Sequence, residues 1–337
     1  MDIKKVLFEL SEKDCIGHVK DAYEAALEVL SRYAEIKTAS DSGIIGFIKG
    51  KSDYTVLLDA HIDQVGMIVT DVDSEGFLSL SNSGGIDIRA LPARQVTVHG
   101  KTKIPAVFCS TPPHLAKGET EYTDISKIKL DTGLGVKAKD IVSVGDYVTF
   151  SEKPAFLAGD FVAGRSFDDR SAVAVLLEVA ERLSDKELPC NVEILLSGGE
   201  ELGMRGAKAS AFIAAPNEAI AVDVSFGNAP GISEDECGVL GKGPMIGVSP
   251  VLDRKMSDRL IAVAKENGIN YQLEAMGGRT GTNADVISVS RGGVKTGTVS
   301  IPLRNMHTEN EVLSISDLYS VCDLLEKYIL SGGLLSA

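Results

Sequence analysis

Two kinds of sequence alternate along this chain, and their order constrains the fold more than any other feature. Most of the chain alternates short apolar runs, such as Val192 to Leu196, with amphipathic stretches, such as Arg170 to Leu183. Short buried strands between amphipathic helices are typical of a mostly parallel sheet covered by helices on both faces. The exception runs from about residue 66 to about residue 159 and has almost no helical periodicity.

This exceptional stretch consists of short apolar segments, for example Gln95 to Val98 and Tyr147 to Phe150, separated by turns rich in Gly, Pro, Asp and Asn. We therefore predict an α/β fold in which a mostly parallel sheet is flanked by helices. We further predict that the α/β domain, which would carry any catalytic residues, is formed discontinuously by residues 1–65 and 160–337, and that residues 66–159 form an inserted small β-barrel domain. A small sandwich would fit the pattern of the insertion as well.

Composition excludes several classes of protein. No stretch approaches the about 18 to 20 consecutive apolar residues that a membrane-spanning helix needs, and Met1 to Leu10 alternates charged and apolar residues, unlike a signal peptide. The 5 cysteines are an odd number without a CxxC pair, which argues against a disulfide framework or a thiolate zinc site. We expect a cytoplasmic protein without a membrane partner.

Charge and missing motifs narrow the function further. The net charge of −14 disfavours nucleic acid as a partner, because phosphate binding needs clustered Lys and Arg. The chain has no GxSxG elbow, no P-loop and no GxGxxG after a strand. Serine hydrolases, nucleotide hydrolases and dinucleotide-binding enzymes are therefore disfavoured.

Candidate functional residues follow predicted strands of the α/β part, where ligands bind in open α/β sheets. They fall in five segments: 59–63 (DAHID), 166–170 (SFDDR), 199–203 (GEELG), 221–224 (AVDV) and 305–308 (NMHT). His61 ends an apolar run, with Asp63 two residues later. A metal-binding imidazole usually donates its other N–H to a carboxylate, which makes Asp63 a candidate for orienting His61. The alternative is a strand-end histidine that bonds to a turn aspartate.

Two pairs of adjacent carboxylates follow. Asp168 and Asp169 precede a predicted helix, so one of them fits a helix cap, whereas the second exceeds what a cap requires and could bridge two cations. Glu200 and Glu201 follow a very apolar strand and two glycines. Their repulsion would raise one pKa unless cations were near, and a metal lets one ligate while the other acts as general base. A solvated cluster at a helix start is the alternative.

Asp223 interrupts an apolar run, where an unpaired charge is costly, and His307 follows the last predicted strand. Each is unremarkable alone. Together with the other candidates they supply the nitrogen and oxygen ligands that zinc, cobalt or manganese prefer. The other histidines, His18, His99 and His114, lie away from the carboxylates in sequence, and we expect surface or structural roles for them.

At this point the sequence resembles a known family. The segments DAHIDQVG, GRSFDDRSAV, EELGMRGA, AVDV and RNMHTENEV, in this order around one β-rich insertion, are similar to those of the M42 metallo-aminopeptidases over nearly the whole chain. The resemblance implies two divalent metal ions per subunit, one completed by His61 and Asp223 and the other by Glu201 and His307. It also implies that Asp168 bridges the two ions.

The same resemblance implies that Glu200 is the general base and that Asp63 orients His61. The expected reaction is hydrolysis of the first peptide bond of short peptides by a metal-activated water. The insertion would be a dimerisation domain, with dimers assembling into a dodecamer. The chain departs from the family at Arg279 to Asp285, where a Gly-Thr-Asp-Ala stretch is expected, and at Asn305, where an aromatic residue is common.

Three alternatives stay open at this point. A glycoside hydrolase would use two carboxylates about 5 to 10 Å apart and usually aromatic platforms, but this chain has no Trp and 5% aromatic residues. A non-catalytic metal-binding scaffold is disfavoured because Glu200 and all proposed ligands are present. A deacylase or a carboxypeptidase-like amidohydrolase would use the same metals.

Overall fold

The computed structural model describes residues 1–112, 114–115 and 124–335. Its largest element is an eight-stranded sheet of order β17-β16-β18-β15-β5-β14-β4-β3. Four neighbouring central strands run parallel: β18 (Lys295–Leu303), β15 (Glu218–Phe226), β5 (Thr55–His61) and β14 (Asn191–Ser197). The predicted mostly parallel sheet is confirmed at its centre.

The edges of this sheet are mixed. On one side β4 (Gly43–Ile48) pairs antiparallel with β14, and β3 (Glu35–Ser40) pairs antiparallel with β4. On the other side β16 (Met245–Val248) pairs antiparallel with β18, and β17 (Gln272–Ala275) pairs parallel with β16. The strand β3 alternates exposed and partly buried residues, as an edge strand does.

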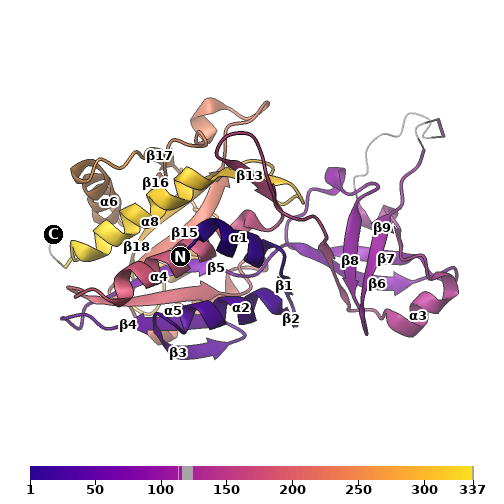
Figure 1. The fold of residues 1–337 in the computed structure, drawn as a ribbon, viewed down its shortest axis with the longest axis horizontal. Coiled ribbons are helices and arrows are strands. Elements are labelled where there is room, and N and C mark those ends of the chain that lie inside the picture. Colours follow the sequence, from indigo (N-terminus) through magenta and orange to yellow (C-terminus); the bar gives the residue numbers. More distant parts are fainter. Residues whose placement is uncertain (113, 116–123, 336–337) are drawn as a thin grey trace.

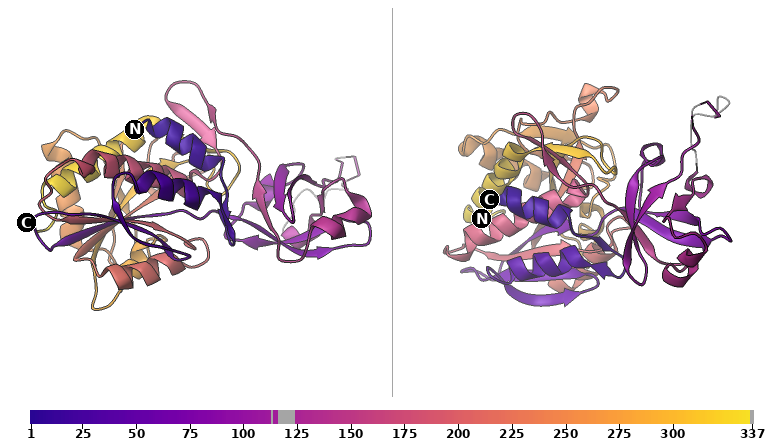
Figure 2. Two further views of the ribbon diagram at one scale, coloured as in Figure 1. Left: turned by 60° about the horizontal axis from the view of Figure 1, so that its bottom comes forward. Right: turned by 45° about the vertical axis from the view of Figure 1, so that its right-hand side comes forward.

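Helices cover both faces of the sheet, as the left view of Figure 2 shows. Successive strand residues point to opposite faces, so Val56 and Leu58 of β5 join one core cluster while Leu57 joins another. The first core lies under α1 (Ile3–Ser11), α2 (Asp21–Leu30), α4 (Phe167–Ser184), α6 (Arg254–Glu266) and α8 (Ile315–Leu330). The second lies under α5 (Arg205–Ala214) and α7 (Ala284–Ile287).

A separate closed barrel lies beside the α/β part (Figure 1). Its strands are β6 (Gly66–Val72), β7 (Leu78–Ser83), β8 (Gln95–His99), β9 (Lys103–Phe108), β10 (Leu130–Asp131) and β11 (Tyr147–Phe150), in the order β10-β7-β6-β11-β8-β9. It has a core of its own, which includes Met67, Val96 and Phe108. The predicted β-barrel is confirmed, and it is a closed barrel rather than a sandwich.

Smaller elements complete the fold. A three-stranded sheet combines β12 (Ala155–Phe156), β13 (Phe161–Gly164) and β19 (Glu311–Ser314), so the segment that returns from the barrel pairs with a segment near the C-terminus. A hairpin of β1 (Cys15–Ile16) and β2 (Val19–Lys20) precedes α2, and α3 (Ala138–Ile141) belongs to the barrel region. Among the described helices, none is long and apolar enough to span a bilayer.

Candidate metal centre

The candidate residues gather where the parallel strands of the large sheet end. His61 is the last residue of β5, and it pairs in register with Ser197, the last residue of β14. Glu200 and Glu201 lie in the turn that follows β14, and Asp223 lies near the end of β15. Because parallel strands place their carboxyl ends at one edge of the sheet, side chains from three strands converge there.

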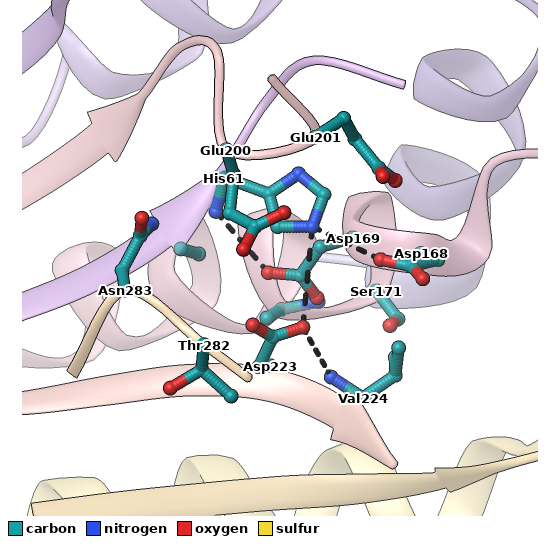
Figure 3. A network of polar contacts seen from close by, with 12 residues as sticks. His61, Asp168, Asp169, Ser171, Glu200, Glu201, Asp223, Val224, Thr282 and Asn283 are labelled. Carbon is teal, nitrogen blue, oxygen red and sulfur yellow. Dashed lines mark hydrogen bonds and ion pairs between the residues drawn. The ribbon is translucent and has the colours of Figure 1, made fainter. Parts of the chain in front are cut away.

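Two further segments reach this edge from outside the parallel strands. Asp168 and Asp169 stand at the start of α4, where their backbone is not helical. His307 lies in the turn between β18 and β19. Thus the structure brings all the predicted metal ligands to one place, and Figure 3 shows the carboxyl groups of Asp168, Glu200 and Asp223 around His61.

Asp168 is the centre of this arrangement. One of its oxygens, Oδ1, lies 3.0 Å from His61 Nε2, and the other, Oδ2, lies 3.2 Å from His307 Nε2. The two histidines each have a second carboxylate nearby: His61 Nε2 lies 3.9 Å from Asp223 Oδ1, and His307 Nε2 lies 3.6 Å from Glu201 Oε1. One carboxylate therefore joins two His-carboxylate pairs.

Groups of potential ligands occur here as three overlapping sets, in each of which the ligand atoms lie within 4.8 Å of one another. Among the described residues, the sets are His61 with Asp169 and Asp223, His61 with Glu200 and Glu201, and Asp168 with Glu201 and His307. The donors are imidazole nitrogens and carboxylate oxygens, which suit zinc, cobalt and manganese.

The site is buried and strongly acidic, which shifts the pKa values of its groups. Burial opposes the charge of Asp168, but hydrogen bonds with His307 and His61 outweigh it and lower the pKa of this carboxyl group. Burial, and then repulsion from Asp168, raises the pKa of Glu201 to about 10. Burial followed by the same repulsion also raises the pKa of Glu200. Carboxyl groups crowded in this way are expected where cations bind.

Asp63 differs in detail from its expected position. His61 Nδ1 lies 3.2 Å from the backbone oxygen of Asp63 and 3.7 Å from its carboxylate Oδ1, so the nearer partner is the main chain. The Asp63 carboxylate instead accepts hydrogen bonds from the backbone N–H groups of Glu200 at 3.0 Å and Glu201 at 3.2 Å. Asp63 thus holds the turn that carries both glutamates as well as contacting His61.

Two further acidic residues, Asp169 and Glu311, hold the segments that carry the ligands. Asp169 accepts from the backbone N–H of His61 through Oδ2 and from that of Ala172 through Oδ1, so it combines the predicted cap with a contact to the ligand segment. Glu311 is buried and accepts from the backbone N–H groups of Asp168 and His307. It ties together the two segments that the central carboxylate connects.

The barrel region also contributes to the site. Gly84 and Gly85 lie so close to it that a β-carbon on Gly85 would stand 3.1 Å from His307 Nδ1, and one on Gly84 would stand 3.3 Å from the Glu201 side chain.

The three other histidines lie outside the site, as expected. His18 and His114 are exposed, and His99 is buried against Thr149 in the barrel. Asn305 has a φ of 56°, a left-handed conformation that asparagine tolerates better than most residues.

Comparison with known proteins decides the family. The family model described as M42 glutamyl aminopeptidase matches residues 42–324, which is most of the chain. This chain belongs to the M42 peptidase family. The resemblance found in its sequence segments is thereby confirmed, and family membership makes the chain a peptide-bond hydrolase of the aminopeptidase class.

Individual relatives of this M42 peptidase agree with that assignment. The chain is 31% identical to a lysyl aminopeptidase of Pyrococcus furiosus over 291 residues, covering 84% of this chain and 83% of the relative. It is 26% identical to a glutamyl aminopeptidase of Lactococcus lactis over 327 residues, covering 94% and 91%. The fold matches that of the TET1 peptidase of Pyrococcus horikoshii with a TM-score of 0.86 at 29% identity, covering 98% of this chain and 99% of that one. The TET1 peptidase can assemble into a tetrahedron or a large octahedral shell.

Proposed function

We propose that this M42 peptidase removes N-terminal residues from peptides, with two divalent metal ions held by His61, Asp168, Glu201, Asp223 and His307. The observation that carries this proposal is the position of Asp168, whose two oxygens lie 3.0 Å from His61 Nε2 and 3.2 Å from His307 Nε2. A carboxylate between two histidine-carboxylate pairs suits a bridge between two cations. His61 with Asp223 and His307 with Glu201 then complete the two sites.

The chemistry of the donors fits this role. Burial raises the pKa of Asp223 well above its ordinary value, and burial raises that of Glu201 to about 10. Among the described residues, no Lys or Arg lines the cavity that could neutralise these groups. Divalent cations would offset the repulsion and let all the carboxyl groups ionise.

Bound at this centre, two divalent ions such as zinc, cobalt or manganese would supply Lewis acidity toward the peptide carbonyl and activate water at neutral pH. Glu200 belongs to the same cavity and is half-buried, so its carboxylate can accept a proton from that water and return it to the leaving amine. Asp63 fixes the main chain of Glu200 and also contacts His61, which makes it a positioning residue. The free amino group of the substrate would lie among the acidic side chains.

The alternatives receive less support. Apart from histidines, Phe226 is the one aromatic side chain among the described residues that line the cavity, and a glycoside hydrolase usually offers aromatic platforms. A non-catalytic scaffold would have no need to keep a carboxylate such as Glu200 beside the potential ligands. A deacylase would use the same metals but would cleave N-acylated substrates, whereas an aminopeptidase needs a free amino group, so the choice of substrate distinguishes the two.

The test uses one set of peptides with free and N-acetylated ends, assayed after loading the protein with zinc, cobalt or manganese. We expect stepwise release of the first residue from free peptides and no cleavage of the acetylated ones, because a blocked amine loses its charge. Cello-oligosaccharides serve as the glycosidase control. Release of acetate, or faster cleavage of the blocked peptides, would contradict the aminopeptidase proposal.

We further propose that the barrel region, residues 66–159, is a dimerisation domain and that dimers assemble into a dodecamer. A structure of the Pyrococcus horikoshii TET1 relative described as a dodecamer supports the assembly. Apolar side chains exposed in the barrel region, including Val107, Val136 and Val144, support its role as the dimer contact. A reducing, cytoplasmic location is supported by the 5 free cysteines, 3 of which are buried.

A further inference from the structure

A large cavity opens beside the candidate metal centre and continues well beyond it. Its volume is about 860 Å³, and its lining includes His61 and Asp168, Glu274 on β17, and Asp235 and Glu236 of the short 3-10 helix Glu234–Glu236. On the proposed function, the first side chain of a peptide would lie in this cavity, because the cavity is continuous with the potential ligands His61 and Asp168. Its far end therefore decides which first residue is accepted.

The far end of this cavity is acidic. Glu274 is half-buried and lines the cavity, and Asp235 and Glu236 are exposed at its rim. No Lys or Arg is found among the described residues that line the cavity. Within the described part of the chain, none of these three carboxylates forms an ion pair within 4.0 Å. No cationic side chain of the described lining therefore offsets the charge of these carboxylates.

Strand register places Glu274 on the same face of the sheet as Asp223. Asp223 of β15 pairs with Ser300 of β18, and Ser300 pairs with Met245 of β16. Gly247 lies two residues after Met245 on β16, and it pairs with Glu274 of β17. Paired residues and residues two apart share a face of a sheet. The Glu274 carboxylate therefore belongs to the same concave surface as the metal centre.

Two hydrogen bonds fix the position of the Glu274 carboxylate but leave it able to bind a cation. Glu274 Oε1 accepts from the hydroxyl of Ser225, and Oε2 accepts from that of Ser300 at 2.7 Å. A carboxylate has about four acceptor positions, so two hydroxyl donors leave room for a cation. Ser225 is two residues beyond Asp223 on β15, about 7 Å along the strand. The flexible four-carbon stem of a lysine suits a separation of this order.

We propose that this cavity selects peptides whose first residue is cationic, lysine or arginine, and that Glu274 is the residue that recognises the charge. This rests on the proposed aminopeptidase function and adds its substrate class. An acidic first residue would be repelled by Glu274 and by the rim carboxylates. An apolar first residue would cover Glu274 without supplying a partner for its charge, which weakens binding.

The test compares lysine amide with norleucine amide, which has a similar aliphatic stem but no ammonium group. For the unchanged enzyme we expect the kcat/KM ratio of lysine to norleucine to be about 10 to 100, the range of a hydrogen bond to a charged group. Glu274→Gln keeps size and one acceptor oxygen, and it should lower this ratio at least about tenfold. The control is Glu187→Gln, which removes the same charge from a side chain that is 83% exposed and pairs with Lys51; it should leave the ratio unchanged.

Two further measurements keep the test decisive. Metal content and thermal unfolding of Glu274→Gln should match the unchanged enzyme, which excludes a folding defect. Calorimetric titration with free lysine and free norleucine measures recognition without catalysis, so it still decides the substrate class if no amide is hydrolysed and the proposed reaction is wrong. Equal use of norleucine, a preference for glutamate, or a parallel loss of both activities in Glu274→Gln would overturn the proposal.

Discussion

Glu200 and Glu201 are neighbours in the chain, yet their carboxyl groups have different surroundings. Glu201 Oε1 lies 3.6 Å from His307 Nε2, and Glu201 belongs to the potential ligand group with Asp168 and His307 as well as to the group with His61. Glu200 belongs to the group with His61 and Glu201 alone, and it is proposed to act on the water. We expect Glu200→Gln to lower kcat by about 10² to 10⁴ with two metals retained, because the amide cannot accept a proton. Glu201→Gln should instead lose one metal, and high metal concentration should restore part of its activity.

Kinetics and elemental analysis of the two variants distinguish these roles. If Glu200→Gln loses metal and Glu201→Gln does not, the two assignments are exchanged. If neither variant has reduced peptidase activity, the proposed site is wrong.

The sequence predicted the residues of this site better than their contacts. His61, Asp223 and the glutamate pair could be recognised because each follows or interrupts an apolar strand, and parallel strands end at one edge. Glu311 was missed because it begins a short strand whose partner, β13, lies far away in sequence. Glu274 was missed because its place in the cavity depends on three pairings among the four strands β15, β18, β16 and β17, which periodicity does not reveal.

At the scale of the elements, the start of α5 packs closely against the segment that carries the glutamates. Gly206 donates its N–H to the oxygen of Gly198, and a β-carbon on it would lie 2.1 Å from that oxygen and 2.2 Å from the oxygen of Ser42. We expect Gly206→Ala to lower the free energy of unfolding by about 1 to 3 kcal/mol through overpacking. Because Gly198 precedes Glu200 by two residues, kcat should fall as well.

Denaturant unfolding and kinetics of Gly206→Ala test this expectation. The matched control is Gly292→Ala, where nothing lies within 4 Å of the added carbon, and its stability should change by less than about 0.5 kcal/mol. Equal stability of both variants would show that α5 does not constrain this segment.

The same helix shows why some elements were not predicted. α5 has small residues at its buried positions, Gly206, Ala207, Ser210 and Ala211, while Phe212 and Ile213 are exposed, so it lacks a clear apolar stripe. The strand β3 is an exposed edge strand without an apolar run. By contrast β14 is buried over its whole length, and the apolar run Val192 to Leu196 predicted it.

At the scale of the whole molecule, the barrel stands beside the α/β part and has its own core (Figure 1). If residues 66–159 form a dimerisation domain, the intact chain should sediment as a large oligomer, and a chain with this segment replaced by a short linker should give smaller species. Analytical ultracentrifugation at micromolar concentration measures both masses. A fully active monomer would argue against the proposed assembly.

The barrel has a second consequence for the whole molecule, since Gly84 and Gly85 pack against Glu201 and His307. The shortened chain should therefore also have a damaged metal centre. Its loss of activity is not evidence about assembly, and mass is the quantity to compare.

The proposed dinuclear metal centre is tested most directly by measuring metal content and aminopeptidase activity on the same samples. The protein is stripped with a chelator until elemental analysis finds no metal, and zinc, cobalt or manganese is then added stepwise. We predict no activity in the stripped protein, recovery as metal is added, and saturation at two ions per chain, because Asp168 lies between two histidines that each have a second carboxylate nearby. Full activity with metal verified as absent would contradict this account.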